Sequence, residues 1–229
     1  MRAVIFDLDG TLLDTLADLA AAVNRALAAR GLPVHPLDAY RFFVGEGAAT
    51  LVQRALPAAA RGGTLAQEVL ASFVEDYGRH WRVTTRPYDG IPELLAALAG
   101  RGLALAVLSN KPQDFTRLCV GQFFGDIPFA QVLGEELGRP RKPHPAGALA
   151  IASRLGLPPA AFLYLGDTAI DMETARAAGM YGVGALWGFR SRAELEESGA
   201  RALVASPQEL LPLLDAPPRL PPGETRSLS

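Results

Sequence analysis

The sequence contains almost no cysteine or histidine. Cys119 is the single cysteine among 229 residues, so no disulfide can form within the chain. It lies in an apolar stretch with no metal-ligand pattern beside it, which predicts a buried packing residue and an intracellular chain. The three histidines, His35, His80 and His144, share no ligand spacing, so we predict no histidine-bound metal.

Excess charge and long apolar segments are also missing. The formal net charge is −2, which gives no electrostatic argument for nucleic-acid binding. No apolar run approaches the roughly 18 residues that a membrane-spanning helix needs. The opening MRAVIFDLDG is too short and too acidic for a signal peptide. We therefore expect a cytoplasmic protein that binds neither nucleic acid nor membrane.

Lysine is scarce although arginine is common. Only Lys111 and Lys142 are lysines among the 22 lysine and arginine residues. Lysine is a compact charge on a slim stem, whereas arginine ends in a planar fork. Each lysine is therefore a candidate for a position where the fork does not fit, with chance as the alternative.

Short apolar runs alternate with helical patterns over most of the chain. The runs predict buried strands, with the last two as edge strands: 2–6, 103–108, 162–165, 181–185, 127–133 and 202–204. The helical patterns cover residues 92–99, 115–124, 146–155 and 170–178. Strands that alternate with helices predict an α/β fold with a Rossmann-like, doubly wound parallel sheet core.

The alternation stops between residues 16 and 82. Helical patterns cover residues 16–27, 48–56 and 65–81, with no credible strand between them. We predict an inserted small all-helical cap domain over residues 16–82 and a core made of residues 1–15 and 83–215. The alternative is a set of packing helices with no role at a site. Residues 216–229 are rich in proline and polar residues, which predicts a disordered tail.

Acidic residues follow two of the predicted strands. In FDLDGTL, Asp7 and Asp9 leave a buried strand at the edge where parallel sheets build their sites. In LGDTAID, Asp167 ends another strand and Asp171 follows four residues later. Either pair alone could belong to a turn or a helix cap. Together they predict a Mg²⁺ site, because neighbouring carboxylates favour a hard cation.

Groups that can bind an anion follow the other predicted elements. Ser109, Asn110 and Lys111 end a strand, and Ser109 can offer a hydroxyl and loop N–H groups to a phosphate oxygen. Lys142 lies in the proline-rich loop RPRKPHP before a helix. The alternative for Lys111 is a side chain that points to solvent, because it follows Ser109 by two residues.

These four motifs, in this order, resemble those of the haloacid dehalogenase superfamily from residue 1 to about residue 214. The matching elements are FDLDGTL, Ser109, Lys142 and the GDxxxD string from Gly166 to Asp171. The resemblance implies that Asp7 is a nucleophile and Asp9 a general acid and base. It implies that Mg²⁺ is held by Asp7, Asp167 and Asp9, the last through its backbone carbonyl, with Asp171 in support. Substrate or phosphate contacts are then expected from Thr11, Gly45, Ser109, Asn110 and Lys142.

Four further strings are similar to phosphoglycolate phosphatases within that superfamily: FVGEGA, SNKPQDFT, KPHPA and ALWGFRS. Asp9 argues against the dehalogenase branch, which lacks this acid. Gly45 and Gly47 would let the cap backbone approach a substrate. A substrate carboxylate could meet Arg54 or Arg41, and the sequence does not choose between them.

We therefore predict a Mg²⁺-dependent phosphomonoester hydrolase that acts through an aspartyl-phosphate on a small phosphorylated metabolite, with 2-phosphoglycolate favoured. Three alternatives stay open. The substrate could be another small phosphate ester or pyrophosphate. The enzyme could be a phosphosugar mutase similar to β-phosphoglucomutase. The chain could be a receiver-type Mg²⁺-binding signalling module rather than an enzyme. Both a monomer and a homodimer are compatible with the sequence.

Overall fold

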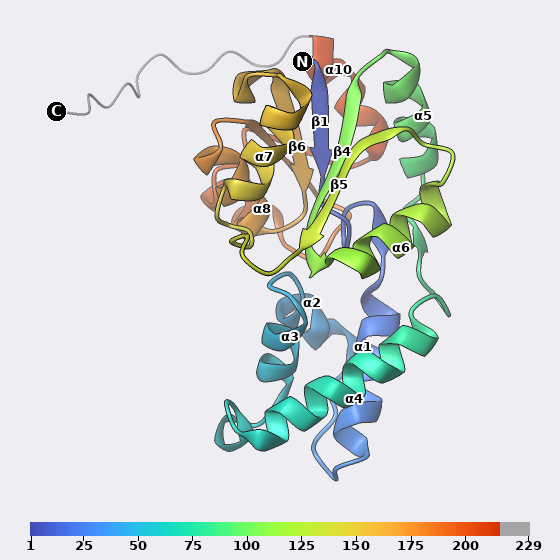
Figure 1. The fold of residues 1–229 in the computed structure, drawn as a ribbon, viewed down its shortest axis with the longest axis vertical. Helices are drawn as coiled ribbons and strands as arrows, with labels where there is room; N and C mark the ends of the chain where they lie inside the picture. The colour runs from blue at the N-terminus through green and yellow to red at the C-terminus, as the bar shows by residue number, and fades with distance from the viewer. Residues whose placement is uncertain (216–229) are drawn as a thin grey trace, which may run out of the picture.

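The protein is built on one six-stranded parallel sheet, seen at the top of Figure 1 in the computed structural model. The structure describes residues 1–215; the predicted tail lies outside them. The strand order is β5-β4-β1-β6-β7-β8, which confirms the predicted doubly wound α/β fold and both edge strands. The strands are β1 Ala3–Phe6, β4 Ala104–Pro112, β5 Phe129–Glu135, β6 Phe162–Gly166, β7 Tyr181–Ala185 and β8 Ala202–Val204.

The central strand β1 is covered on both faces, which is why it reads as a continuous apolar run. Val4 and Phe6 belong to the core cluster that includes helices α5 (Ile91–Gly100), α6 (Gln113–Phe124) and α10 (Leu210–Asp215). Ala3 and Ile5 belong to a second cluster with α7 (Ala146–Leu155) and α8 (Ala169–Ala177). Cys119 is fully buried in the first cluster, as predicted.

Residues 16–82, called the helical insertion below, lie beyond the carboxyl ends of the central strands (Figure 1). The insertion contains α1 (Leu16–Ala28), α2 (Leu37–Phe43), α3 (Ala48–Ala55) and α4 (Thr64–His80). The helices predicted at 16–27, 48–56 and 65–81 are confirmed, whereas α2 was not predicted. On either side of the insertion, β2 (Leu13–Asp14) and β3 (Arg86–Pro87) pair antiparallel and bring the two connections together. A two-residue strand has no periodicity that a sequence can reveal. No helix within residues 1–215 is long and apolar enough to span a bilayer.

Asp18, in the first turn of α1, ties the insertion to the returning chain. Its carboxylate accepts hydrogen bonds from the backbone N–H and hydroxyl groups of Thr84 and Thr85, over 2.8–3.1 Å. Burial opposes the charge, but these hydrogen bonds dominate and hold the pKa of Asp18 below its ordinary value. The carboxylate therefore stabilises the junction between insertion and sheet in its ionised form.

We expect Asp18→Asn to lower the free energy of unfolding by about 2–3 kcal/mol at pH 7, because an amide nitrogen replaces one of the two acceptor oxygens and leaves buried donors without a partner. The folded-state pKa is depressed, so the stabilisation is present above the ordinary pKa of aspartate and is lost as the pH falls through the folded-state pKa. The difference between wild type and variant should therefore shrink in acid. Urea unfolding at pH 7 and at acidic pH measures it. Asp38→Asn, at an exposed carboxylate of the same insertion, is the control and should change little. Equal effects of the two variants would contradict the assignment.

Candidate active site

Three buried acids converge where β1 and β6 end. Asp7 follows β1 directly, Asp167 follows β6, and Asp171 lies in the first turn of α8. One carboxylate oxygen from each lies within 4.8 Å of the other two. The strand order reverses at β1, which has β4 on one side and β6 on the other, and this is where α/β sheets form binding sites.

Lys142 is the cation at the centre of this acidic cluster. Its ammonium lies 2.8 Å from Asp7 Oδ1 and 2.7 Å from Asp171 Oδ1, and its side chain is 2% exposed. Burial opposes its charge, but Asp171 and Asp7 raise the pKa of Lys142 well above the ordinary value. Lys142 is thus a permanent cation held by the acids around it.

The three carboxylates still repel each other in spite of Lys142. Burial, followed by the charge of Asp171, raises the pKa of Asp7 well above its ordinary value. The same two causes raise the pKa of Asp167 to about 7. An oxygen-only donor set with excess negative charge fits a hard divalent cation such as Mg²⁺.

Each acid is oriented differently by its neighbours. Asp167 accepts hydrogen bonds from Thr11 Oγ1 at 2.8 Å and from the backbone N–H of Phe189 at 2.8 Å. Gly10, with φ +88°, packs so closely against Asp167 that a Cβ there would lie 2.3 Å from its Oδ2. Asp171 caps α8 by accepting from the backbone N–H and the hydroxyl of Thr168.

The three acids differ in how many of their carboxylate oxygens already have a partner. Both oxygens of Asp171 are engaged, one by Lys142 and one by Thr168. In Asp7, Oδ1 accepts from the backbone N–H of Leu8 at 2.7 Å and faces Lys142, whereas Oδ2 has no hydrogen-bond partner within residues 1–215. Asp7 is therefore the acid with a free oxygen, and Asp171 is suited to support.

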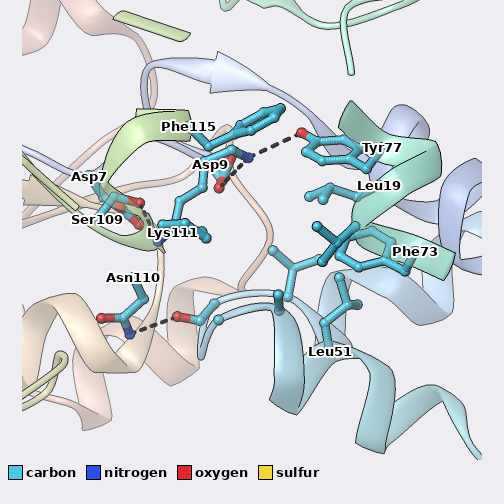
Figure 2. A pocket seen from close by; sticks show the side chains of 16 residues that line it. Asp7, Asp9, Leu19, Leu51, Phe73, Tyr77, Ser109, Asn110, Lys111 and Phe115 are labelled. Atoms are coloured by element: carbon cyan, nitrogen blue, oxygen red, sulfur yellow. Dashed lines mark hydrogen bonds and ion pairs between the residues drawn. The ribbon is translucent and has the colours of Figure 1, made fainter. Parts of the chain in front are cut away.

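Asp9 lies apart from this cluster, at a cavity of about 100 Å³ between sheet and insertion (Figure 2). Lys111 donates to both of its carboxylate oxygens, at 2.9 and 3.1 Å, and to the hydroxyl of Tyr77 on α4 at 3.1 Å. The Lys111 side chain is 5% exposed, so the alternative that it points to solvent is wrong. Burial opposes its charge, but Asp9 raises the pKa of Lys111 above the ordinary value.

The two walls of this cavity differ in character. On the sheet side Pro112 and Phe115 are apolar, and the other lining residues are polar: Asp7, Asp9, Ser109, Asn110 and Lys111. On the insertion side they are largely apolar, with the backbone of Gly45 and Gly47 beside them: Leu19, Val44, Leu51, Phe73 and Val74. Figure 2 shows Leu19, Leu51 and Phe73 facing Asp9 and Lys111 across the opening.

The loop at residues 44–46 is docked on the sheet through its backbone. The carbonyls of Val44, Gly45 and Glu46 accept hydrogen bonds, each at 3.1 Å, from Arg190, Asn110 and Arg141 respectively. Neither arginine was predicted at the site, although both lie within strings that the sequence analysis singled out.

Asn110 has a further role at the sheet edge. Its amide group also exchanges hydrogen bonds with the backbone of Lys142, at 3.1 and 2.9 Å. The same side chain therefore joins the loop that carries Lys142 to the insertion.

The residues predicted for substrate contact fall into two groups. Gly45, Ser109 and Asn110 line the cavity, whereas Thr11 and Lys142 lie within the acidic cluster. The predicted metal ligands Asp7 and Asp167 share that cluster, but the Asp9 side chain is bound by Lys111.

Neither arginine suggested for a substrate carboxylate lines the cavity. Arg54 pairs with Glu46 and with the carbonyls of Phe42 and Phe43, and Arg41 donates to the carbonyl of Gly188 at 2.9 Å. Tyr77 does line the cavity and was not predicted, because helical spacing marks it only as one more apolar position of α4.

Comparison with known proteins gives consistent matches. The chain is 34% identical over 215 residues to a phosphoglycolate phosphatase of Pseudomonas putida, covering 92% of this chain and 79% of that protein. It is 36% identical over 221 residues to an N-acetylmuramic acid 6-phosphate phosphatase of Pseudomonas aeruginosa, covering 94% and 95% of the two chains. A solved structure from Lactobacillus delbrueckii subsp. bulgaricus, assigned there as a phosphoglycolate phosphatase, superposes with a TM-score of 0.88 at 33% identity, covering 93% and 98%.

The family model of haloacid dehalogenase-like hydrolases matches residues 1–179, which include all four motifs. This match confirms the resemblance that those motifs carry. The chain belongs to the haloacid dehalogenase-like hydrolases.

Proposed function

We propose that this protein is a Mg²⁺-dependent phosphatase that transfers the phosphoryl group of 2-phosphoglycolate to Asp7 and then to water. The observation that carries the proposal is the free oxygen of Asp7, held at the cavity edge by Lys142 on the opposite oxygen. A carboxylate held in this way is a suitable nucleophile. Residues 16–82 would form the cap, and residues 1–15 and 83–215 the catalytic core.

In the first step, Asp7 Oδ2 attacks phosphorus and the bond to the ester oxygen breaks. Asp9 gives its proton to that oxygen, so that the alcohol leaves neutral. The position of Asp9 supports this role. Its carboxylate lies outside the acidic cluster and lines the cavity, which is where the leaving group would lie. Ser109, which lines the cavity, and the ammonium of Lys142, which contacts Asp7, would bind phosphoryl oxygens.

In the second step, water attacks the phosphorus of the aspartyl-phosphate and Asp9 accepts the proton of that water. The bond between phosphorus and Asp7 breaks, which restores the carboxylate and releases phosphate. Asp7, Asp167 and the backbone carbonyl of Asp9 would hold Mg²⁺, with Asp171 in support. Bound Mg²⁺ would offset the repulsion between the carboxylates and the phosphate.

The cavity favours a small leaving group. The apolar residues of the insertion lie directly across the cavity from Asp9 and Lys111, which suits a two-carbon acid better than a phosphorylated sugar. Phosphoglycolate would therefore fit this cavity better than the amino-sugar substrate named for the Pseudomonas aeruginosa relative.

A phosphate-release screen with Mg²⁺ over phosphoglycolate, sugar phosphates, nucleotides and pyrophosphate tests the substrate. We expect the highest kcat/KM for phosphoglycolate. A hexose phosphate turned over with little phosphate release would instead indicate a mutase. No release from any ester would favour a binding module.

Replacing Asp7 by Asn should lower kcat by at least about 1,000-fold, because the amide is not a nucleophile. Wild-type protein quenched during turnover should carry a hydroxylamine-labile phosphate that the variant lacks. Asp126→Asn, at an exposed position of the sheet domain, is the matched control and should retain full activity. Full activity in Asp7→Asn would rule out the covalent mechanism.

Thr11→Val should raise the Mg²⁺ concentration for half-maximal activity by about 10- to 100-fold, because Asp167 loses the hydroxyl that orients it. Chelation of the metal should abolish activity, and Mg²⁺ should restore it. Thr174→Val removes a buried hydroxyl that bonds only within α8, and it should leave the Mg²⁺ dependence unchanged. Activity that survives chelation would contradict the metal requirement.

The apparent affinity for Mg²⁺ should rise with pH. Asp167 has a pKa of about 7 and must lose its proton to bind a cation. Below that pKa the affinity should fall by up to about tenfold per pH unit, and above it the affinity should level off. Activity titrated with Mg²⁺ between pH 5.5 and 8.5 measures the slope. A pH-independent half-maximal concentration would contradict the assignment of Asp167.

A further inference from the structure

Lys111 is the single cation of the cavity. Of the described residues that line it, Lys111 alone carries a positive charge, and the opposite wall is largely apolar. Its ammonium also lies over the rings of Tyr77 and Phe115, at 4.9 and 5.3 Å from their centroids. Aromatic faces attract a cation and hold it in place where water is excluded. The cavity therefore presents a fixed charge to whatever part of the substrate enters it.

One of the three hydrogen bonds that the Lys111 ammonium donates can be replaced by a hydrogen bond to a substrate. Two are made with the carboxylate oxygens of Asp9, and one with the hydroxyl oxygen of Tyr77. An ammonium forms a stronger hydrogen bond with a carboxylate than with a phenol oxygen. An entering carboxylate would therefore replace the contact with Tyr77.

Tyr77 supplies a second donor beside the ammonium. Its hydroxyl oxygen accepts from Lys111, and its own hydrogen has no acceptor within residues 1–215. Burial raises the pKa of Tyr77, so the hydroxyl keeps this hydrogen at neutral pH. An ammonium and an O–H donor side by side match the two oxygens of a carboxylate.

We propose that Lys111 and Tyr77 form the subsite that binds a carboxylate of the leaving group. The enzyme would thereby select phosphoesters whose alcohol carries that carboxylate one or two carbons from the ester oxygen. The spacing follows from the 2.9 Å between Lys111 Nζ and Asp9, which contacts the ester oxygen in the mechanism above. The inference rests on the proposed function and adds the residues that recognise the acid.

The test compares 2-phosphoglycolate with 2-hydroxyethyl phosphate, in which an alcohol replaces the carboxylate. The quantity measured is the ratio of kcat/KM for the two substrates, with the full chain and saturating Mg²⁺. Because each variant is its own reference, a general loss of activity cancels in this ratio. We expect wild type to prefer phosphoglycolate by about 100-fold, as for hydrogen bonds to a charged group.

Lys111→Met should lower that preference by about 10- to 100-fold. Tyr77→Phe, which keeps the aromatic packing, should lower it by about tenfold. Arg82→Met removes a cation from an exposed position outside the cavity and should leave the preference unchanged.

Two results would overturn the inference while leaving the phosphatase in place. One is a wild type that hydrolyses both esters equally well. The other is a Lys111→Met variant that loses both activities by the same factor, which would make Lys111 a positioning residue for Asp9. A wild type that hydrolyses neither ester would instead refute the proposed function itself.

Discussion

The buried contacts of Lys142 with Asp7 and Asp171 are the interaction on which the rest of the site depends. Carboxylates crowded within 4.8 Å can stay ionised in a dry environment only if cations compensate them. Removing one partner from such a buried pair costs about 3–5 kcal/mol, because the remaining charge has no partner. Asp7 follows β1, Asp171 lies in α8, and Lys142 lies in the loop after β5, so this one charge contact joins three separate elements of the sheet domain. The same contact leaves the second oxygen of Asp7 free at the cavity.

Much of this arrangement could be predicted from the sequence. A buried parallel strand is apolar along its whole length, so the first polar residue after it marks the sheet edge, as Asp7 and Asp167 do. Parallel strands end at the same edge, and the acids therefore had to meet. The long helices α1 and α4 can also be predicted, because their apolar residues recur at helical spacing. By contrast, β2, β3 and α2 are too short to produce a pattern.

The direction of individual side chains could not be predicted in the same way. Lys111 faces inward because Tyr77, 34 residues earlier in the chain, meets it from α4. Arg54 and Arg41 bind Glu46 and backbone carbonyls, and neither lines the cavity. Both lysines are buried between acids and aromatic or backbone groups, where a compact ammonium can approach several acceptors at once. The scarcity of lysine was thus a useful signal, although its meaning depended on contacts distant in sequence.

The docking of the loop at residues 44–46 has an evolutionary consequence. Arg190, Asn110 and Arg141 bind its backbone carbonyls, which every amino acid supplies. These hydrogen bonds between sheet and insertion therefore do not depend on which side chain the loop presents to the cavity. A substitution at Val44 would change the cavity lining without removing these hydrogen bonds, whereas Gly45 has φ +123°, which other residues adopt only with strain. In this chain, attachment of the loop to the sheet and the choice of the Val44 side chain are therefore independent constraints on the sequence.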